Sequence, residues 1–224
     1  MALAQFKDLC LDAADPARLG LFWGQVLGLD YHPQDGGDGW LTGATPQHTI
    51  WVNRVPEVKT VKHRVHFDIY AERLADLEAL GSVVLEPAGD GRPWTLMADP
   101  EGGEYCVFLR PGPPADRLHG LVVDSAGPAA QAQWWGEVYG VPVEHNPRGW
   151  STVRDVPGMP ILTMDFNPVP EPKTAKNRVH WDVTVPDLDA LVQHGATVLR
   201  PPAGDANWHV MADPEGNEFC AFPA

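Results

Sequence analysis

The chain has few cysteines and no long apolar run, and its opening residues do not have the pattern of a signal sequence. Its three cysteines, Cys10, Cys106 and Cys220, are too few and too widely spaced in 224 residues for a disulfide framework or a zinc cage. No apolar stretch approaches the roughly 18 residues of a membrane-spanning helix. The opening MALAQFKDLC lacks the uninterrupted apolar core of a secretory signal. These absences predict a protein of the reducing cytoplasm that makes no use of a membrane.

Basic residues are also scarce. The chain has 16 Lys and Arg against 30 Asp and Glu, a formal net charge of −14. A field of this sign repels phosphate backbones, so nucleic acid is not expected as a partner. The sequence contains no phosphate-binding loop, no dinucleotide fingerprint and no recognisable nucleophile triad. The common nucleotide-dependent and hydrolytic enzyme classes are therefore not indicated.

Turn formers and indoles, in contrast, are abundant. The 22 glycines and 23 prolines predict many tight turns and short elements, which favours a sheet-rich fold over a helical bundle. The chain also has nine tryptophans. Indole rings stack well on flat or cationic ligands, so the tryptophans are candidates for a binding surface as well as for the core.

The chain is an internal duplication. The segment MADPEGGEYC at 97–106 returns as MADPEGNEFC at 211–220, with eight of ten residues identical. RVHFD at 64–68 returns as RVHWD at 178–182, and VPEVKTVKHR at 55–64 returns as VPEPKTAKNR at 169–178. Ordered matches of this kind indicate two homologous halves. We expect two domains, 1–113 and 117–224, joined through the Pro- and Gly-rich segment RPGPPADR at 110–117.

Each half has two units in which one strand and one helix precede three strands. In the first unit, residues 6–12 have the pattern of a strand, Asp15 and Pro16 begin a helix, and Gly28 ends it. Short strands are expected around Tyr31 and at 40–42 and 48–53. The second unit repeats the order with a strand at 64–70, a helix at 72–80, and strands at 83–85, 94–97 and 104–109.

These segments resemble the vicinal oxygen chelate superfamily, which includes glyoxalases, bleomycin-resistance proteins and extradiol dioxygenases. The resemblance rests on the opening from Asp12 to Pro16 followed by WGQVLG at 23–28, on the RVHxD strand and on the DPEGxExC closing strand. It covers nearly the whole chain. It implies an α+β fold with tandem glyoxalase-like domains, each with two βαβββ units that form a half-open curled mixed sheet with helices on the convex face. The concave face would hold a ligand or a metal.

Strand alternation places one histidine of each half on the concave face. If Val65, Phe67 and Ile69 cover the helices, then His66 and its neighbours on the same strand face point into the cavity. The same alternation places Glu104, Cys106 and Phe108 on the cavity side and Tyr105, Val107 and Leu109 on the helix side. The second half repeats the pattern with His180, Glu218, Cys220 and Phe222.

The resemblance also implies a metal site, with ligands on the first and fourth strands, a histidine on the fifth and a glutamate on the last. Only His66 and His180 match it. The first-strand position falls on Phe6 and Leu118, and the closing glutamate is replaced by Cys106 and Cys220. The fourth-strand position falls on Trp51 or Asn53 in the first half and on Asp165 or Asn167 in the second. We therefore expect no metal and no other cofactor, although a thiolate, an imidazole and Asp165 remain an alternative set for zinc.

The leading functional hypothesis is a bleomycin-resistance-like protein that binds a small aromatic or cationic molecule without metal. The indoles support it, because Trp40 with Trp150 and Trp94 with Trp208 fall at equivalent places in the two halves. The expected ligand-binding residues are Trp40, Trp51, His66, Trp94, Glu104, Cys106, Trp150, Asp165, His180, Trp208, Glu218 and Cys220.

The alternative is a divalent-metal-dependent lyase or dioxygenase in which Glu104 or Glu218 moves a proton. Cys106 and Cys220 are either apolar fillers or nucleophiles, and a nucleophilic thiolate would need a cation such as Arg64 or Arg178. Whether the protein is an enzyme stays open at this point. Two halves that cover each other's sheet edges would form a monomer with pseudo-dimeric halves, with a homodimer as the other option.

Overall fold

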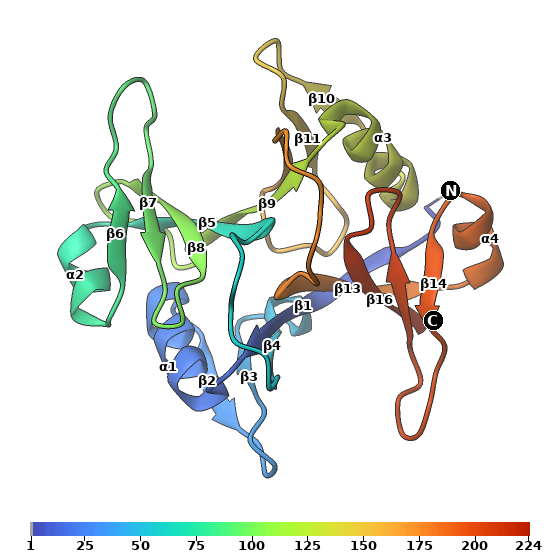
Figure 1. The fold of residues 1–224 in the computed structure, drawn as a ribbon, viewed down its shortest axis with the longest axis horizontal. Coiled ribbons are helices and arrows are strands. Elements are labelled where there is room, and N and C mark those ends of the chain that lie inside the picture. Colours follow the sequence, from blue (N-terminus) through green and yellow to red (C-terminus); the bar gives the residue numbers. More distant parts are fainter. Residues whose placement is uncertain (1) are drawn as a thin grey trace.

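The computed structural model describes residues 2–224, which repeat a βαβββ unit four times (Figure 1). Units 1 and 2 make up the first half of the chain. Unit 1 comprises β1 (Gln5–Ala13), α1 (Pro16–Leu27), β2 (Asp30–Pro33), β3 (Gly39–Thr42), the 3-10 helix η1 (Pro46–His48) and β4 (Ile50–Arg54). Unit 2 comprises β5 (Val65–Ala71), α2 (Leu74–Ala79), β6 (Val83–Glu86), β7 (Thr95–Ala98) and β8 (Glu104–Leu109).

Units 3 and 4 repeat the order in the second half. Unit 3 comprises β9 (Leu118–Ser125), α3 (Pro128–Tyr139), β10 (Val143–His145), β11 (Ser151–Arg154) and β12 (Thr163–Pro168). Unit 4 comprises β13 (Val179–Val185), α4 (Leu188–Gln193), β14 (Thr197–Arg200), β15 (His209–Ala212) and β16 (Glu218–Pro223). The predicted elements are thus confirmed within a few residues, except that His48 lies in η1 and not in a strand.

The strands form two open, mixed, eight-stranded sheets. Sheet 1 has the order β14-β15-β16-β13-β1-β4-β3-β2, and sheet 2 has the order β10-β11-β12-β9-β5-β8-β7-β6. This confirms the α+β class and the tandem arrangement of βαβββ units. One detail of the prediction is corrected: the two units of one half do not share a sheet. Sheet 1 joins units 1 and 4, and sheet 2 joins units 2 and 3, because β1 pairs antiparallel with β13 and β5 with β9.

Helix α1 explains why the two units of the first half are not joined edge to edge. Its N-cap Asp15 accepts the backbone N–H of Arg18, and Gly28 ends it at φ 75°, a left-handed conformation that costs glycine little. The helix packs against its own strands, while Trp23 makes edge-to-face contacts with Phe67 and Tyr105 of unit 2 at 5.2 and 5.0 Å. The helix therefore lies between the two units and fills the space where their sheets would meet.

Helix α3 has the same place in the second half. Its Trp135 is fully buried and contacts Trp181 of β13 and Phe219 of β16 at 4.9 and 5.1 Å. The apolar faces of the strands complete this core, as alternation predicted for Val65, Phe67 and Ile69. Leu109 is an exception, because it is the last residue of β8 and is 51% exposed. No helix of residues 2–224 is both long and apolar enough to span a bilayer.

The repeated DPEG motif braces the helix starts. Glu101 accepts hydrogen bonds from the backbone N–H groups of Ala14 and Asp15 ahead of α1, and Glu215 accepts that of Gly127 ahead of α3. Asp99 and its counterpart Asp213 close their own turns by accepting backbone N–H groups two and four residues on. The motif is therefore structural and lies away from the concave faces.

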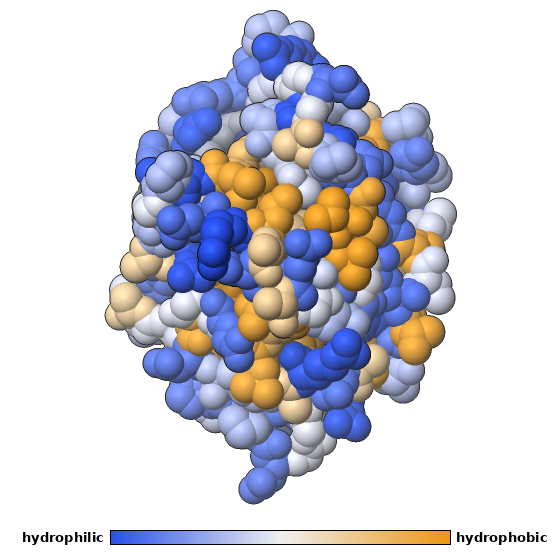
Figure 2. Space-filling model, turned by 90° about the vertical axis from the view of Figure 1, so that its left-hand side faces the viewer, coloured by the Kyte–Doolittle hydropathy of each residue, from blue (hydrophilic) through white to orange (hydrophobic). Residues whose placement is uncertain are grey.

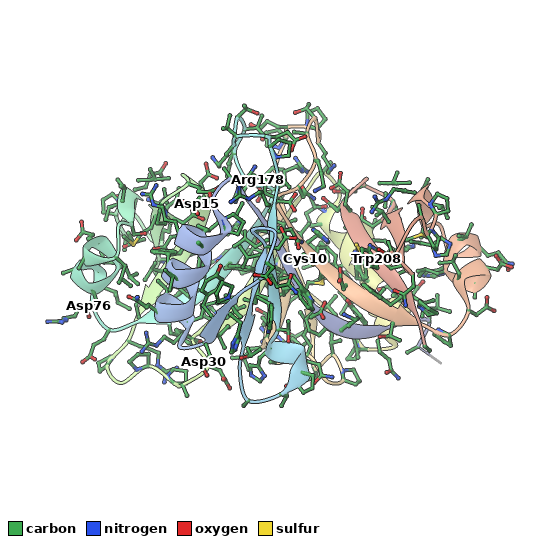
Figure 3. The ribbon with its side chains drawn as sticks, turned by 90° about the horizontal axis from the view of Figure 1, so that it is seen from below. Cys10, Asp15, Asp30, Asp76, Arg178 and Trp208 are labelled. Atoms are coloured by element: carbon green, nitrogen blue, oxygen red, sulfur yellow. The ribbon has the colours of Figure 1, made fainter. Side chains whose placement is uncertain are left out.

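The VPExKT segments form two arms, 55–64 and 169–178, that cross between the sheets. Arg64 donates to the carbonyl of Glu171 at 2.7 Å, and Arg178 donates to that of Glu57 at 2.7 Å. Figure 3 shows Arg178 at the end of the molecule where the two arms meet. Because these guanidinium groups hold the opposite arm, they do not face the cysteines, and the idea that they activate a thiolate is not supported.

Candidate functional site

A cavity of about 640 Å³ lies on the concave face of sheet 1. Strands from both halves enclose it, β1 and β4 from unit 1 and β13 to β16 from unit 4. Figure 3 shows Cys10 and Trp208 on the two sides of this junction. Neither half of the chain contains the whole site, since β1 and β13 meet only through the pairing of the halves.

Aromatic rings form the walls of the cavity. Trp208 stacks on Phe222 with ring centroids 5.2 Å apart and an interplanar angle of 25°. Trp51 lines the other side, and its Nε1 donates to Asp8 Oδ2 at 3.2 Å. The fixed indole of Trp51 and the stacked pair opposite present flat apolar surfaces, which suit a planar guest.

Four donor side chains form the floor, and we call them the donor cluster: Cys10, His180, Asp182 and Cys220. They come from three adjacent strands, because Cys10 lies opposite His180 on β13 and Asp182 lies beside Cys220 on β16. The thiol of Cys10 donates to Asp182 Oδ2 at 3.6 Å, and Cys220 Sγ lies 3.6 Å from His180 Nε2. All four residues are buried.

Burial sets the protonation of the donor cluster. It lowers the pKa of His180 to about 4, so the imidazole is neutral at pH 7. It also raises the pKa of Asp182 to about 8, assisted by the negative charge of Asp8 directly opposite on β1. The pKa values of the Cys10 and Cys220 thiols are likewise raised by burial, so neither is an activated nucleophile.

The charged groups at the rim are paired, with one exception. Lys7 lies 2.6 Å from Asp8 and also sits over the Phe222 ring at 4.3 Å. Lys176 pairs with Asp12, and Glu218 pairs with Lys173 of the arm at 2.7 Å. Arg200, which is exposed on β14, has no ion-pair partner within the described part of the chain.

The equivalent face of sheet 2 has a reduced donor set and a different filling. His66, Asp68 and Cys106 repeat three of the four donors, but Val122 lies opposite His66 where sheet 1 has Cys10. His119 stands at the position of Lys7 and stacks on Tyr70 at 4.0 Å. Sheet 2 therefore carries aromatic packing across part of the face that is hollow in sheet 1.

The predicted site residues divide between these two faces. Trp51, His180, Trp208, Glu218 and Cys220 line the cavity of sheet 1. A second group belongs to sheet 2: His66, Trp94, Glu104, Cys106 and Asp165. The structure thus divides the predicted set between two surfaces.

Two tryptophans differ from the expected equivalence. Trp40 lies opposite Trp51 in sheet 1, whereas the residue in the same register of sheet 2 is Thr152, opposite Asp165. Trp40 stacks on His32 at 5.3 Å, while Trp150 lies just before β11 with Arg148 over its ring at 5.9 Å. Trp40 and Trp150 are therefore not counterparts. The offset of 112 residues that relates Gly28 to Gly140 continues unchanged through both hairpins, so Thr152 is the counterpart of Trp40 and Trp150 lies two residues before it.

The two glutamates assigned to proton transfer hold the arms. Glu104 accepts from Lys59 at 2.8 Å and from the backbone N–H of His63, and Glu218 accepts from Lys173 and the N–H of Asn177. The hydrogen bonds from Lys59 and His63 outweigh burial and lower the pKa of Glu104. Both carboxylates are therefore engaged in holding the arms.

Sequence reasoning missed Cys10, Asp8 and Arg200. The count to the first-strand position led to Phe6, but a register shift between Phe6 and Asp8 turns Phe6 into the core. Strand alternation counted back from Asp12 would have put Cys10 and Asp8 on the concave face. The sequence alone could not show that Cys10 and Asp8 lie next to His180, because this depends on the pairing of β1 with β13.

A second cavity, about 860 Å³, lies between the two arms. Although it is larger, its cations already have partners: Lys62 pairs with Asp124 at 2.6 Å, Lys59 with Glu104, and Arg178 with Glu101 at 3.1 Å. It offers a guest fewer flat aromatic surfaces than sheet 1. The cavity of sheet 1 is therefore the better candidate site.

Comparison with known proteins agrees with this architecture. A family model described as "Glyoxalase-like domain" matches residues 8–108 and again 120–222. No curated protein gives a significant sequence match. Among solved structures, glyoxalase I from Zea mays is 13% identical with a TM-score of 0.68, over 97% of this chain and 92% of that one. A putative dioxygenase from Bacillus subtilis subsp. subtilis str. 168 is 15% identical with a TM-score of 0.69, over 99% and 86%. At these identities the two structures support the fold alone.

Proposed function

The chain belongs to the glyoxalase-like domain family along both of its halves, and from this premise we propose that it binds a small aromatic acid in the cavity of sheet 1. The observation that carries the proposal is the composition of the cavity. Trp51, Trp208 and Phe222 offer flat apolar walls, and Arg200 is the lining cation that lacks an ion-pair partner among residues 2–224. The volume of about 640 Å³ is within the usual range for small-molecule sites.

The local charges favour an acid over a cation. The net charge of −14 acts at long range and is screened by salt. At the cavity itself, Asp12 and Glu218 are neutralised by lysines, and the raised pKa of Asp182 leaves it largely protonated at pH 7. A guest ammonium would find no free carboxylate, whereas a guest carboxylate would find the guanidinium of Arg200.

The test compares three 1-substituted naphthalenes whose substituents are anionic, neutral and cationic at pH 7: 1-naphthoic acid, 1-naphthalenemethanol and 1-naphthylmethylamine. Titration calorimetry and tryptophan quenching are expected to give the tightest binding for the acid. Arg200→Glu and Trp208→Ala should each weaken binding of the acid by about tenfold or more, which corresponds to about 1.4 kcal/mol.

Sheet 2 supplies the matched controls. Glu86 and Trp94 are the counterparts of Arg200 and Trp208, so Glu86→Arg and Trp94→Ala are expected to leave the affinity for 1-naphthoic acid unchanged. If none of the probes saturates, if the amine binds best, or if Trp94→Ala weakens binding as much as Trp208→Ala, the proposal is wrong.

A further inference from the structure

Asp12 and Lys176 form a polar corner of the sheet 1 cavity. Among residues 2–224, these two line both this cavity and the cavity between the arms, and no other residue is common to the two. Lys176 donates a hydrogen bond to Asp12 Oδ2. Asn53, which also lines the sheet 1 cavity, lies beside Asp12 on β4. The corner is therefore polar, in contrast to the aromatic walls, and it faces the space that a ligand would occupy.

Both partners of this ion pair have unused hydrogen-bonding capacity. The Asp12 side chain is only 6% exposed, and its Oδ1 accepts no hydrogen bond from the described part of the chain. The Lys176 side chain is 56% exposed, and Asp12 takes up one of the three N–H groups of its ammonium. A carboxylate oxygen that is largely shielded from water and has no donor costs free energy. A guest that donates to Asp12 Oδ1 would remove this cost.

A donor and an acceptor side by side are complementary to a hydroxyl group. A hydroxyl can accept a hydrogen bond from the Lys176 ammonium and donate one to the Asp12 carboxylate, whereas an ether oxygen can only accept. The two charges of the pair already balance each other, so a second guest carboxylate at this corner would add an uncompensated charge. Hydrogen bonding and charge therefore both favour a neutral hydroxyl here.

The polar corner lies at the far end of the cavity from Arg200. One row of residues in register crosses sheet 1 from β14 to β1, and it consists of Arg200, Val210, Cys220, Asp182 and Asp8. The row spans four steps between strands, about 19 Å in a flat sheet, and Asp12 lies four residues further along β1, about 13 Å. Arg200 and Asp12 are therefore at diagonally opposite corners, with the cavity between them.

We propose that the ligand of the sheet 1 cavity is an aromatic acid that carries a hydroxyl group at the end remote from its carboxylate. This inference rests on the proposed function, in which Arg200 holds the carboxylate and the aromatic walls hold the ring. The hydroxyl accepts a hydrogen bond from Lys176 Nζ and donates one to Asp12 Oδ1. Asp12 and Lys176 thereby determine specificity, because an acid without the hydroxyl leaves Asp12 Oδ1 without a donor.

Sheet 2 has an equivalent ion pair but a different residue at the opposite corner. Lys62 pairs with Asp124 at 2.6 Å, as Lys176 does with Asp12. Glu86 occupies the register position of Arg200 and lies 2.5 Å from Arg92. Sheet 2 therefore presents a carboxylate where sheet 1 presents a guanidinium. One hydroxylated acid per chain is expected, bound at sheet 1.

The experiment titrates the full-length protein with three acids: 2-naphthoic acid, 6-hydroxy-2-naphthoic acid and 6-methoxy-2-naphthoic acid. The substituents at positions 2 and 6 lie at opposite ends of the ring system, and the hydroxyl is neutral at pH 7. Titration calorimetry is expected to show that the hydroxy acid binds about tenfold or more tightly than 2-naphthoic acid, because it makes hydrogen bonds to charged groups. The methoxy acid can accept but not donate, so it should bind no more tightly than 2-naphthoic acid.

The paired substitution Asp12→Leu/Lys176→Met tests the two residues directly. It replaces the ion pair by apolar side chains of similar size, a change that folded proteins often tolerate. It should remove the preference for the hydroxy acid and keep the affinity for 2-naphthoic acid. The matched control in sheet 2 is Asp124→Leu/Lys62→Met, which should leave the preference for the hydroxy acid as it is in the wild type.

The three acids on the wild-type protein are decisive even if the Asp12→Leu/Lys176→Met protein does not fold. The role of the hydroxyl is overturned if 2-naphthoic acid or the methoxy acid binds as tightly as the hydroxy acid. It is also overturned if the preference survives in a folded Asp12→Leu/Lys176→Met protein. In each of these cases the binding of an aromatic acid still stands. If none of the three acids saturates the wild-type protein, both proposals are overturned.

Discussion

Cys10 and His180 lie directly opposite each other where β1 pairs antiparallel with β13, although they belong to different halves of the chain. This one register brings a thiol, an imidazole and the Asp8–Asp182 carboxyl pair together on the floor of a ring-lined cavity. In sheet 2 the corresponding register brings His66 opposite Val122 and Asp68 opposite Gly120. Two sheets with the same topology therefore differ in donors because of substitutions on two strands, at Cys10 and Asp8 against Val122 and Gly120, and at Trp51 against Asp165.

The shared construction of each site predicts that the halves depend on each other. Fragments 1–113 and 117–224 each expose two first strands that lack their partner, β1 with β5 and β9 with β13, so separately produced fragments should self-associate or aggregate. When they are co-expressed with a tag on one of them, the fragments should co-purify as an equimolar complex. If the two fragments are each stable and monomeric, and elute separately when they are mixed in size-exclusion chromatography, this prediction is wrong.

Residues 63 and 103 pack against each other, and the large side chain of His63 faces a glycine at position 103. A Cβ on Gly103 would lie 2.6 Å from Asp99 Oδ2 and 2.7 Å from the ring of His63, whereas in the second half Asn177 donates to Asn217 at 3.0 Å in the equivalent places. Gly103→Asn alone should lower the free energy of unfolding by about 2 kcal/mol through overpacking. The double variant with His63→Asn places asparagines at both positions, as at Asn177 and Asn217. It should recover at least about 1 kcal/mol of the lost free energy of unfolding. Urea denaturation of the wild type, the two single variants and the double variant gives the four free energies of unfolding. Strictly additive effects of the two substitutions would contradict a coupling between residues 63 and 103.

Acid should destabilise the protein partly through His63. Burial lowers the pKa of His63 to about 4 from its ordinary 6.5, so the folded chain keeps this imidazole neutral. Between pH 6.5 and 4 the unfolded chain takes up a proton there that the folded chain does not. The free energy of unfolding therefore falls as the pH drops through that window, by at most about 3 kcal/mol from this one group.

The control for this prediction is the His63→Asn/Gly103→Asn double variant, which keeps the packing and lacks the titrating group. Its stability should decline less steeply than that of the wild type over the same pH range. Denaturation curves at half-unit pH steps make the comparison, and parallel profiles for the two proteins would rule out a contribution from His63.

The arm 55–64 depends on Glu104. This carboxylate pairs with Lys59, both side chains are at most 16% exposed, and it also accepts the backbone N–H of His63. Glu104→Ala leaves the lysine without its partner and should cost about 3 kcal/mol. It should also raise the rate of proteolytic cleavage within the arm, which mass spectrometry of the products would locate.

Asp76→Ala is the matched control, because it breaks an ion pair with Arg73 whose side chains are 51% and 71% exposed. An exposed pair of this kind contributes little to stability, because water and salt screen it. Equal effects of the two substitutions would mean that Glu104 does not anchor the arm. Leu21, Val83 and Leu85 are exposed apolar residues, and Figure 2 shows apolar patches among hydrophilic residues on the face that lies at the left of Figure 1.

Much of the fold was readable from local pattern. Asp15, Pro16 and Gly28 fixed the limits of α1, and alternation along β5 assigned Val65 to the core and His66 to the concave face. Alternation failed at Leu109 because a strand end extends beyond the core, and the position count failed at Phe6 because a register shift inverts the strand faces. Local periodicity carries no information about either event.

The amino-acid sequence by itself determined the duplication, the four βαβββ units and the side of each strand on which His66 and His180 lie, because these follow from short-range periodicity and from repeats. Only the tertiary structure decided that β1 joins β13, that Cys10 therefore meets His180, and that sheet 1 rather than sheet 2 contains the ring-lined cavity described here. Strand pairing between distant segments depends on how α1 and α3 fill the space inside each half, and that packing is a property of the whole chain.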